Sequence, residues 1–202
     1  MSKYTWLIDC GHGGIICGSP VTKGKRSPKW SDGSQLIEGE FNRGIGNRLI
    51  ELCAAADIKT MSIHQIDLDL SLAERVLLVN TTSDLESPCI LISIHANAGG
   101  GNGFEVYTSR GETKSDLVAE IFAGCFSDEF AEVNIRSDYS DGDADKEANF
   151  MMLTKTKCPA ILLESFFMDN ESECRTYLMS KSGRDRIARA YFNAILEVER
   201  KL

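Results

Sequence analysis

Residues 6–14 read WLIDCGHGG, an apolar run that ends in an acid and leads into a turn of glycines around one histidine. A short apolar run bounded by turn residues is typical of a buried strand in a parallel sheet. Glycine adopts backbone conformations that other residues rarely reach. The chain contains only three histidines, and this pattern predicts that His12 lies at the end of a buried strand.

Apolar runs alternate with helical patterns along all 202 residues, of which 43% are hydrophobic. The patterns predict strands at 4–9, 58–64, 89–95, 103–109 and 160–167, and helices at 36–55, 71–82, 112–131 and 183–200. Residues 15–35 contain prolines, glycines and basic residues, which predict a long surface loop. Strands that alternate with helices indicate an α/β fold with a largely parallel sheet, and this length suits a single domain.

Composition restricts the classes of function. A net charge of −8 argues against nucleic acid as a partner, because phosphate binding needs a basic surface. The seven cysteines are scattered without a C-x-x-C pair, which favours free thiols, and Cys53, Cys89 and Cys125 are expected in the core. The first residues contain no signal-peptide pattern, and no apolar run is long enough for a membrane span. We therefore expect a chain made in the cytoplasm, without membrane insertion.

The helix predicted at 36–55 carries an acid on each side. At 100° per residue, Glu38 falls on the apolar face with Phe41, Ile45, Leu49 and Leu52, whereas Glu40 falls on the opposite, solvated face. A carboxylate on an apolar face needs a partner. The helix dipole is one such partner, and a metal ion would be a fuller one.

Three polar residues are associated with predicted strands: His12 follows the first strand, His95 ends the strand at 89–95, and Glu164 ends the apolar run PAILLE. In an open α/β sheet, ligands bind outside the carboxyl ends of the strands. Glu38 on the neighbouring helix adds a second carboxylate to this group. Two imidazoles and one carboxylate, with one position left open, would make a hydrolytic zinc site. A further carboxylate there would act as general base and then protonate a leaving amine.

Each of these residues also has a structural interpretation. His12 is consistent with a simple turn residue or with an anion-binding nest of backbone N–H groups. His95 is consistent with a hydrogen-bonded core histidine, Glu164 with a salt bridge and Glu38 with a helix N-terminal charge. His64 also ends a predicted strand, but no carboxylate or glycine turn accompanies it, so it is expected to be structural or exposed.

Five blocks of the sequence resemble the successive motifs of a known family. They are LIDCGHGG, EGEFNRGIGNRLIEL, SLAERVLLVN, LISIHANA and CPAILLESFFMDNES, in order from residue 5 to about residue 178. They are similar to the zinc-dependent N-acetylmuramoyl-L-alanine amidases of bacterial cell walls and phage endolysins. The resemblance implies one catalytic domain over residues 1–202, without a separate wall-binding module. It also implies a twisted, mostly parallel sheet flanked by helices on both faces.

The resemblance further implies a ligand set and a reaction. One zinc ion (Zn²⁺) would be held by His12, Glu38 and His95, and Glu38 with Asn42 matches the Glu-x-x-x-Asn pattern of the family. The catalytic glutamate of the family falls on Glu164. The implied substrate is peptidoglycan, cleaved at the amide between the lactyl group of N-acetylmuramic acid and L-alanine.

Further residues have less specific expectations. Asp9 and Asn97 flank the ligands and are candidates to orient an imidazole, although turn hydrogen bonds explain them equally well. Arg136 is a candidate to bind a peptide carboxylate of the substrate. Arg75 and Asn80 match family positions and are expected to fix the fold.

The sequence departs from the family pattern in several places. Cys10 stands where proline is common, and we expect its side chain to point into the core. The loop at 15–35 lacks the usual Asp-containing stretch, and its Lys23, Lys25, Arg26 and Lys29 would be solvated or would contact the anionic wall. Gly44 and Gly46 lie inside a predicted helix, where close packing is the expected reason.

Other functions are also consistent with the sequence. They are a non-catalytic wall-binding relative, a zinc peptidase or deacylase with another substrate, and a cysteine hydrolase that uses Cys10 or Cys17. A wall hydrolase made without a signal peptide suggests a phage or prophage endolysin that is released through a membrane pore; a secreted enzyme whose signal has been removed would look the same. Stem-peptide specificity and oligomeric state are left open.

Overall fold

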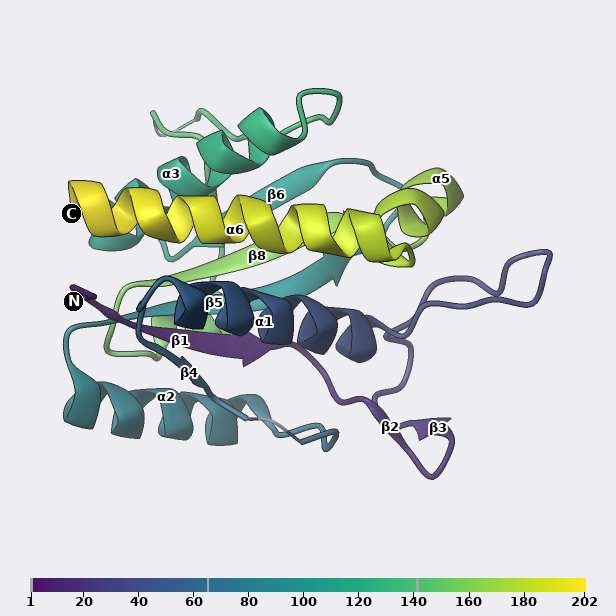
Figure 1. Cartoon of the computed structure of the whole chain (residues 1–202), viewed down its shortest axis with the longest axis horizontal. Helices are drawn as coiled ribbons and strands as arrows, with labels where there is room; N and C mark the ends of the chain where they lie inside the picture. The colour runs from purple at the N-terminus through teal and green to yellow at the C-terminus, as the bar shows by residue number, and fades with distance from the viewer. Residues whose placement is uncertain (1, 65, 141) are drawn as a thin grey trace.

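A six-stranded sheet forms the centre of the computed structural model, which describes residues 2–64, 66–140 and 142–202 (Figure 1). Its strand order is β4-β1-β5-β8-β6-β7. The strands are β1 (Thr5–Cys10), β4 (Thr60–Ser62), β5 (Cys89–Asn97), β6 (Phe104–Thr108), β7 (Lys146–Glu147) and β8 (Ala160–Phe167).

Most strand pairs are parallel, as the alternation of strands and helices predicts. β1 pairs in parallel with β4 on one side and β5 on the other, and β5 pairs in parallel with β8. Only β6 runs antiparallel to its neighbour β8 among these pairs of described strands. Because the chain leaves β1 toward β4 and returns to its other side at β5, the carboxyl ends of β1 and β5 form a switch point, where ligands bind in such folds.

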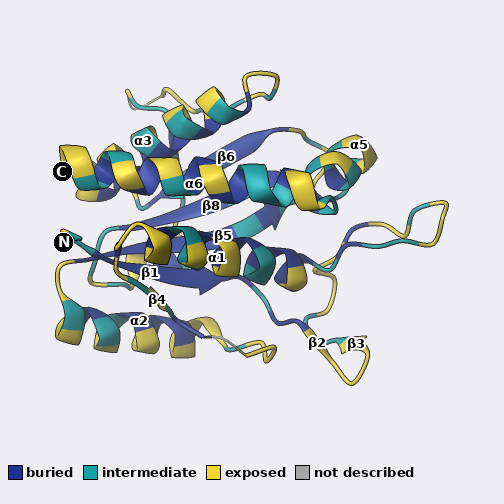
Figure 2. Ribbon diagram, viewed as in Figure 1, coloured by how far each residue is buried: buried dark blue, intermediate teal, exposed yellow. Residues whose placement is uncertain are grey.

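Helices cover both faces of the sheet. The apolar sides of α1 (Glu38–Ala55), α3 (Lys114–Glu129) and α6 (Lys181–Lys201) pack on one face, in a core that includes Trp6, Ile8, Ile92 and Leu163. The other face carries α2 (Leu72–Glu86) and α4 (Met151–Thr154), over a smaller core with Leu7, Leu91 and Leu162. Successive strand residues face opposite sides, so the continuous burial of β1 in Figure 2 follows from coverage on both faces.

The predicted long elements are present, with ends shifted by a few residues. Ser71 caps α2 and forms a capping box with Glu74. The helix predicted at 36–55 begins at Glu38, with Ile37 as its N-cap. The loop at 15–35 is not entirely irregular, because it contains the small hairpin of β2 (Ile15–Ile16) and β3 (Ser19–Pro20). Four further short segments that periodicity does not predict are β7, α4, α5 (Glu171–Glu173) and η1 (Cys174–Leu178).

Close packing explains a glycine inside α1 and confirms the orientation of Cys10. The Cys10 side chain lies in the core, and a Cβ added at Gly46 would come 2.5 Å from its Sγ. Cys53 and Cys89 are also buried, as expected. Cys125 was expected in the core but is partly exposed, because it lies on the side of α3 next to α6 and the solvent.

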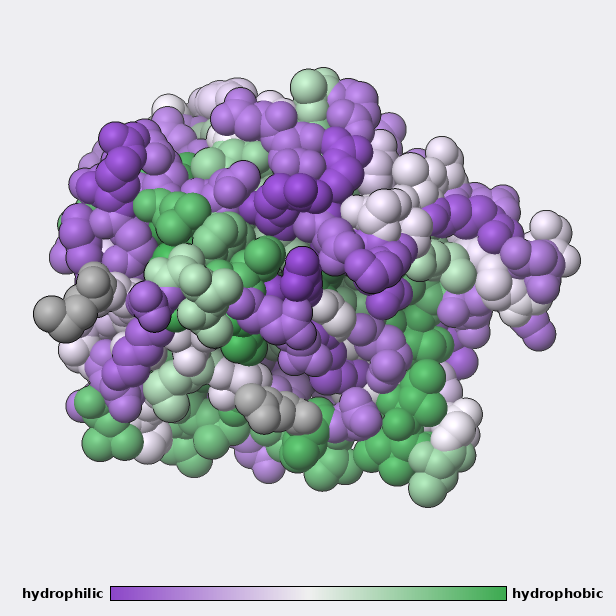
Figure 3. All heavy atoms as spheres, in the orientation of Figure 1, coloured by the Kyte–Doolittle hydropathy of each residue, from purple (hydrophilic) through white to green (hydrophobic). Residues whose placement is uncertain are grey.

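Some apolar surface remains exposed. Figure 3 shows apolar atoms at the β2–β3 hairpin and along α2, where Ile15 and Leu77 are 41% and 66% exposed. No helix in the described ranges is both long and apolar enough to cross a membrane.

Candidate metal centre

His12, Glu38 and His95 converge at the carboxyl ends of β1 and β5. His12 follows β1 in a left-handed backbone conformation (φ 63°), Glu38 is the first residue of α1, and His95 lies near the end of β5. Glu38 Oε1 lies 3.3 Å from His12 Nε2 and 3.2 Å from His95 Nδ1. One ligand atom from each residue lies within 4.8 Å of the others. The structure thus brings together the three residues that the sequence assigns to a metal.

The glycine turn makes this approach possible. A Cβ at Gly11 would lie 2.0 Å from Cε1 of His95, so only glycine leaves room for the imidazole. Asn42 Nδ2 donates to the backbone oxygen of Gly11 at 2.9 Å, and Arg43 Nη1 donates to that of His12 at 3.0 Å. Arg43 was not predicted as part of the site; its position directly after Asn42, which matches the family pattern, was the available signal.

The donor atoms fit a zinc ion. Zinc binds imidazole nitrogen and carboxylate oxygen at about 2.0–2.2 Å in tetrahedral geometry, which separates neighbouring ligand atoms by about 3.3 Å. The two distances to Glu38 Oε1, 3.3 and 3.2 Å, match this separation. His12 Nε2 and Glu38 Oε2 are buried and have no hydrogen-bond partner among the described residues. Buried polar atoms are almost always satisfied, so these two atoms are consistent with ligands of a metal.

The surroundings of Glu38 favour its ionised form, which is the form that binds a metal ion. Glu38 is 1% exposed. Burial alone would raise the pKa of Glu38, but the two imidazoles outweigh this effect and hold the pKa below its ordinary value. Burial lowers the pKa of His12, which favours the neutral imidazole that binds metal. Burial also acts to lower the pKa of His95, but the carboxylates of Glu38 and Glu164 raise it overall.

Glu164 lies beside the three ligands. It is the register partner of His95 on β5 and of Glu105 on β6. Burial raises its pKa to about 7, His95 opposes this shift and Glu38 adds to it. Its Oε2 is buried without a hydrogen-bond partner among the described residues. A carboxyl with this environment is suited to take up and release a proton near neutral pH.

Asp9 does not orient a ligand histidine by a direct hydrogen bond. Its carboxylate accepts from Arg75 Nη1 and Ser93 Oγ, each at 2.7 Å. His64 Nε2 is 3.8 Å from Asp9, and its buried side chain makes His64 structural rather than exposed. Arg75 also donates to the backbone oxygen of Cys10 at 2.7 Å, so this network fixes the end of β1. Arg75 and Asp9 are buried as a pair, because either charge left unpaired in the interior would cost free energy.

Asn97 and Arg136 both bind the carboxylate of Glu105, whereas Asn97 was expected to orient an imidazole and Arg136 to bind a peptide carboxylate of the substrate. Asn97 Nδ2 donates to Glu105 Oε2 and Arg136 Nε donates to Glu105 Oε1, both at 2.6 Å. Glu105 was not predicted as part of the site; its alternation with Phe104 and Val106 along β6 was the available signal. Asn80 exchanges hydrogen bonds with the backbone at Lys155 and Lys157, which agrees with the expected role in the fold.

A pocket of about 290 Å³ opens beside the two ligand histidines, between α2 and α4. Its lining includes His12, His95, Asp69, Leu72 and Met152. Lys25, from the loop at 15–35, contacts Glu38 twice. The backbone oxygen of Lys25 accepts a hydrogen bond from the backbone N–H of Glu38, and Lys25 Nζ lies 4.0 Å from Glu38 Oε2. Only one of the four basic residues of this loop that the sequence singled out, Lys25, is thus recorded beside a ligand.

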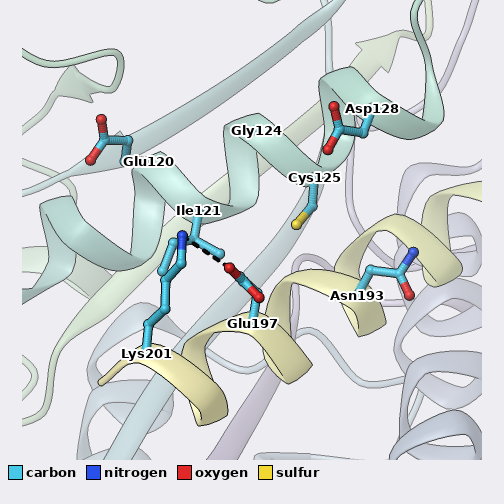
Figure 4. A pocket seen from close by; sticks show the side chains of 8 residues that line it. All are labelled: Glu120, Ile121, Gly124, Cys125, Asp128, Asn193, Glu197 and Lys201. Carbon is cyan, nitrogen blue, oxygen red and sulfur yellow. Dashed lines mark ion pairs between the residues drawn. The ribbon is translucent and has the colours of Figure 1, made fainter.

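A larger groove of about 660 Å³ lies between α3 and α6, away from the three ligands (Figure 4). Glu120, Asp128 and Glu197 line it, and Lys201 Nζ pairs with Glu197 at 2.9 Å. None of the predicted site residues lines this groove. The candidate catalytic residues therefore lie at the strand ends rather than in this groove.

Comparison with known proteins identifies relatives of the chain. The profile of the family described as N-acetylmuramoyl-L-alanine amidase matches residues 7–197. The N-acetylmuramoyl-L-alanine amidase CwlM of Bacillus licheniformis is 28% identical over 194 residues, which cover 94% of this chain and 66% of that protein. A sporulation-specific N-acetylmuramoyl-L-alanine amidase of Bacillus subtilis is 32% identical over 106 residues, which are 52% of this chain and 38% of that protein.

The chain thus spans just under two thirds of one curated relative and about two fifths of the other. Among solved structures, an N-acetylmuramoyl-L-alanine amidase from Clostridium difficile 630 superposes with a TM-score of 0.81 at 26% identity, covering 100% of this chain and 99% of that one. The family profile extends over nearly the whole chain and includes all three convergent ligands and Glu164. The chain belongs to the N-acetylmuramoyl-L-alanine amidase family.

Proposed function

We propose that this chain is a zinc-dependent amidase that cleaves peptidoglycan between the lactyl group of N-acetylmuramic acid and L-alanine. The observation that carries the proposal is the spacing of the three ligand atoms, 3.2 and 3.3 Å about Glu38 Oε1, beside the free carboxyl of Glu164. Membership in the amidase family supports the substrate.

The residues suggest a proton path. A zinc ion held by His12, Glu38 and His95 would supply Lewis acidity, which polarises a carbonyl and makes water more acidic. Glu164 takes a proton from the attacking water as its oxygen adds to the lactyl carbonyl carbon. Glu164 then gives this proton to the amide nitrogen, the C–N bond breaks, and L-alanine leaves as an amine. A carboxyl whose pKa is raised to about 7 can carry out both transfers.

Two alternatives are less well supported. A cysteine hydrolase that uses Cys10 is disfavoured, because burial raises the pKa of this thiol to about 12 and keeps it protonated. Cys17 is exposed in the turn between β2 and β3. The experiment below also tests two further alternatives. They are a zinc peptidase or deacylase with another substrate, and a wall-binding protein without activity.

The experiment is mass spectrometry of purified peptidoglycan after incubation with the zinc-loaded protein, with and without a chelator. Free stem peptides that begin with L-alanine, beside intact glycan strands, are expected only without chelator. Cleavage that resists the chelator would exclude the zinc mechanism. An untouched wall with zinc still bound would exclude the substrate, and a panel of N-acyl peptides would then test the deacylase alternative.

The biological setting is a separate proposal. We propose that the chain is made in the cytoplasm and released as an endolysin, as the sequence analysis expects. A role in sporulation is the other setting, since one relative is named as a sporulation-specific amidase. Expression in a bacterial host with and without a pore-forming holin distinguishes these settings. Lysis that depends on the holin supports an endolysin, whereas wall cleavage without it contradicts that role.

A further inference from the structure

A cluster of donors surrounds Glu105, the register partner of Glu164 on β6. Arg136 Nε and Lys146 Nζ each donate to Oε1 at 2.6 Å. Asn97 Nδ2 and Tyr107 Oη donate to Oε2 at 2.6 and 2.8 Å. Glu105 is 4% exposed, so this carboxylate is fully used within the protein. These five side chains include two cations and one carboxylate, and the carboxyls of Glu164 and Glu173 interact electrostatically with Glu105 and Arg136 respectively.

The guanidinium of Arg136 is partly exposed to solvent. Its side chain is 37% exposed, and the hydrogen bonds recorded for the described residues use only its Nε. The guanidinium carbon lies 5.3 Å from the ring centroid of Phe167, and the backbone N–H of Arg136 donates to Phe104 at 2.9 Å. These contacts hold the guanidinium group in place, and the N–H groups of Nη1 and Nη2 stay available to bind a ligand. Such a planar fork suits a carboxylate.

The spacing between His95 and Glu105, the residue that holds Arg136, is comparable to the reach of two residues of a substrate peptide. His95, Glu164 and Glu105 are register partners across β5, β8 and β6. Neighbouring strands are about 4.8 Å apart, so Glu105 is about 10 Å from His95. In a peptide, two successive Cα steps cover about 7 Å. A hydrogen bond of about 3 Å extends this reach to about 10 Å.

We propose that Arg136, supported by Lys146 on Glu105, binds a carboxylate carried by the residue that follows L-alanine in the stem peptide. This subsite rests on the proposed amidase function and names the charge class of its substrate, a stem with a free carboxylate at the second position. Stems with a carboxamide there lose the charge-assisted hydrogen bond, and the buried Glu105 keeps the cation fixed in either case.

The test uses two N-acetylmuramoyl tripeptides that differ only at the second residue, where one has a free α-carboxylate and the other a carboxamide. For the zinc-loaded protein, we expect kcat/KM to be about 10- to 100-fold higher for the carboxylate, the range of a charge-assisted hydrogen bond. Arg136→Gln should remove most of this preference. Lys146→Gln should reduce the preference less, and Arg136→Lys should retain part of it.

Arg110→Gln is the matched control. Arg110 is exposed beyond the other end of β6 from Glu105, so this variant should keep the full preference. Equal cleavage of both substrates by the unaltered protein would overturn the subsite, as would an equal loss for both in Arg136→Gln.

Binding separates failure of the subsite from failure of the proposed function. In the Glu164→Gln background, calorimetric titration with the two tripeptides should show the same 10- to 100-fold preference. If neither tripeptide is cleaved by the unaltered protein, this titration still decides the subsite, while the peptidoglycan experiment decides the amidase function. Equal affinities would overturn the subsite.

Discussion

His95 and Glu164 are register partners on the adjacent parallel strands β5 and β8. Side chains at paired positions of neighbouring strands point to the same face of a sheet. The sheet therefore places a histidine of the ligand group beside a carboxyl that no described residue satisfies at Oε2. This arrangement separates two roles that mutation can test independently, metal binding and proton transfer.

Glu164→Gln should keep zinc and lose activity. The amide preserves the shape of the side chain but cannot take up the proton of water, so we expect turnover to fall by about 10²- to 10⁴-fold. Zinc content by mass spectrometry and release of L-alanyl peptides from peptidoglycan check the two parts. Glu120→Gln, on the exposed side of α3, should change neither. Loss of zinc from Glu164→Gln would show that this residue is a ligand.

Removal of zinc should destabilise the protein. A ligand that binds only the folded state stabilises it by about 4 kcal/mol at a thousandfold excess over Kd. The melting temperature should therefore fall on treatment with a chelator and recover with zinc. His12→Ala and His95→Ala should lose most of this zinc-dependent shift. His64→Asn tests the third histidine, which contacts Asp9 instead. It should keep one zinc per chain, and a loss of zinc equal to that of His12→Ala would contradict the proposed ligand set.

Long elements and their polar ends could be predicted from the sequence because each follows from a local pattern. The apolar run of β1 and the glycine turn predict the place of His12, and the helical face predicts that Glu38 is buried. The meeting of His12, Glu38 and His95 follows from the general rule for strand ends together with the family motifs. The side chain of Cys10 was placed correctly by strand alternation alone.

The partners of Asp9, Asn97 and Arg136 could not be predicted in this way. They depend on which side chains meet across strands that are distant in sequence, and hydrogen-bond geometry decides between several nearby acceptors. Asp9 binds Arg75 of α2, and Arg136 binds Glu105 because the chain after α3 returns beside Phe104. The β2–β3 hairpin was missed because two-residue strands carry no periodicity.

Two glycines inside helices should respond oppositely to alanine. Gly46→Ala would place a Cβ 2.5 Å from Cys10 Sγ, in a core where the helix cannot move away freely. We expect it to lower the free energy of unfolding by about 1–3 kcal/mol. Gly124→Ala meets no atom within 4 Å and should raise it by about 0.5–1 kcal/mol, because alanine favours a helix. Urea unfolding of both variants gives the comparison, and equal shifts in both would contradict the packing explanation.

The stability contributed by Glu105 should depend on pH. Burial acts to raise the pKa of this carboxyl, but Arg136, Lys146 and Tyr107 outweigh it and lower the pKa to about 2 from an ordinary 4.5. A carboxyl with a depressed folded-state pKa stabilises the protein fully above its unfolded pKa. This contribution is lost as the pH falls from 4.5 through 2, the window between the two values. Its size is on the order of 3 kcal/mol, since one pKa unit corresponds to about 1.4 kcal/mol.

Glu105→Gln measures this contribution directly. At pH 7 the variant should unfold at a clearly lower urea concentration than the unaltered protein. Near pH 3 the difference in unfolding free energy should fall to roughly half or less, because the carboxylate becomes protonated on unfolding. Glu120→Gln, an exposed acid to amide change, should give no difference at either pH. A difference for Glu105→Gln that stays constant from pH 7 to pH 3 would mean that packing, rather than the charge of Glu105, supports Arg136 and Lys146.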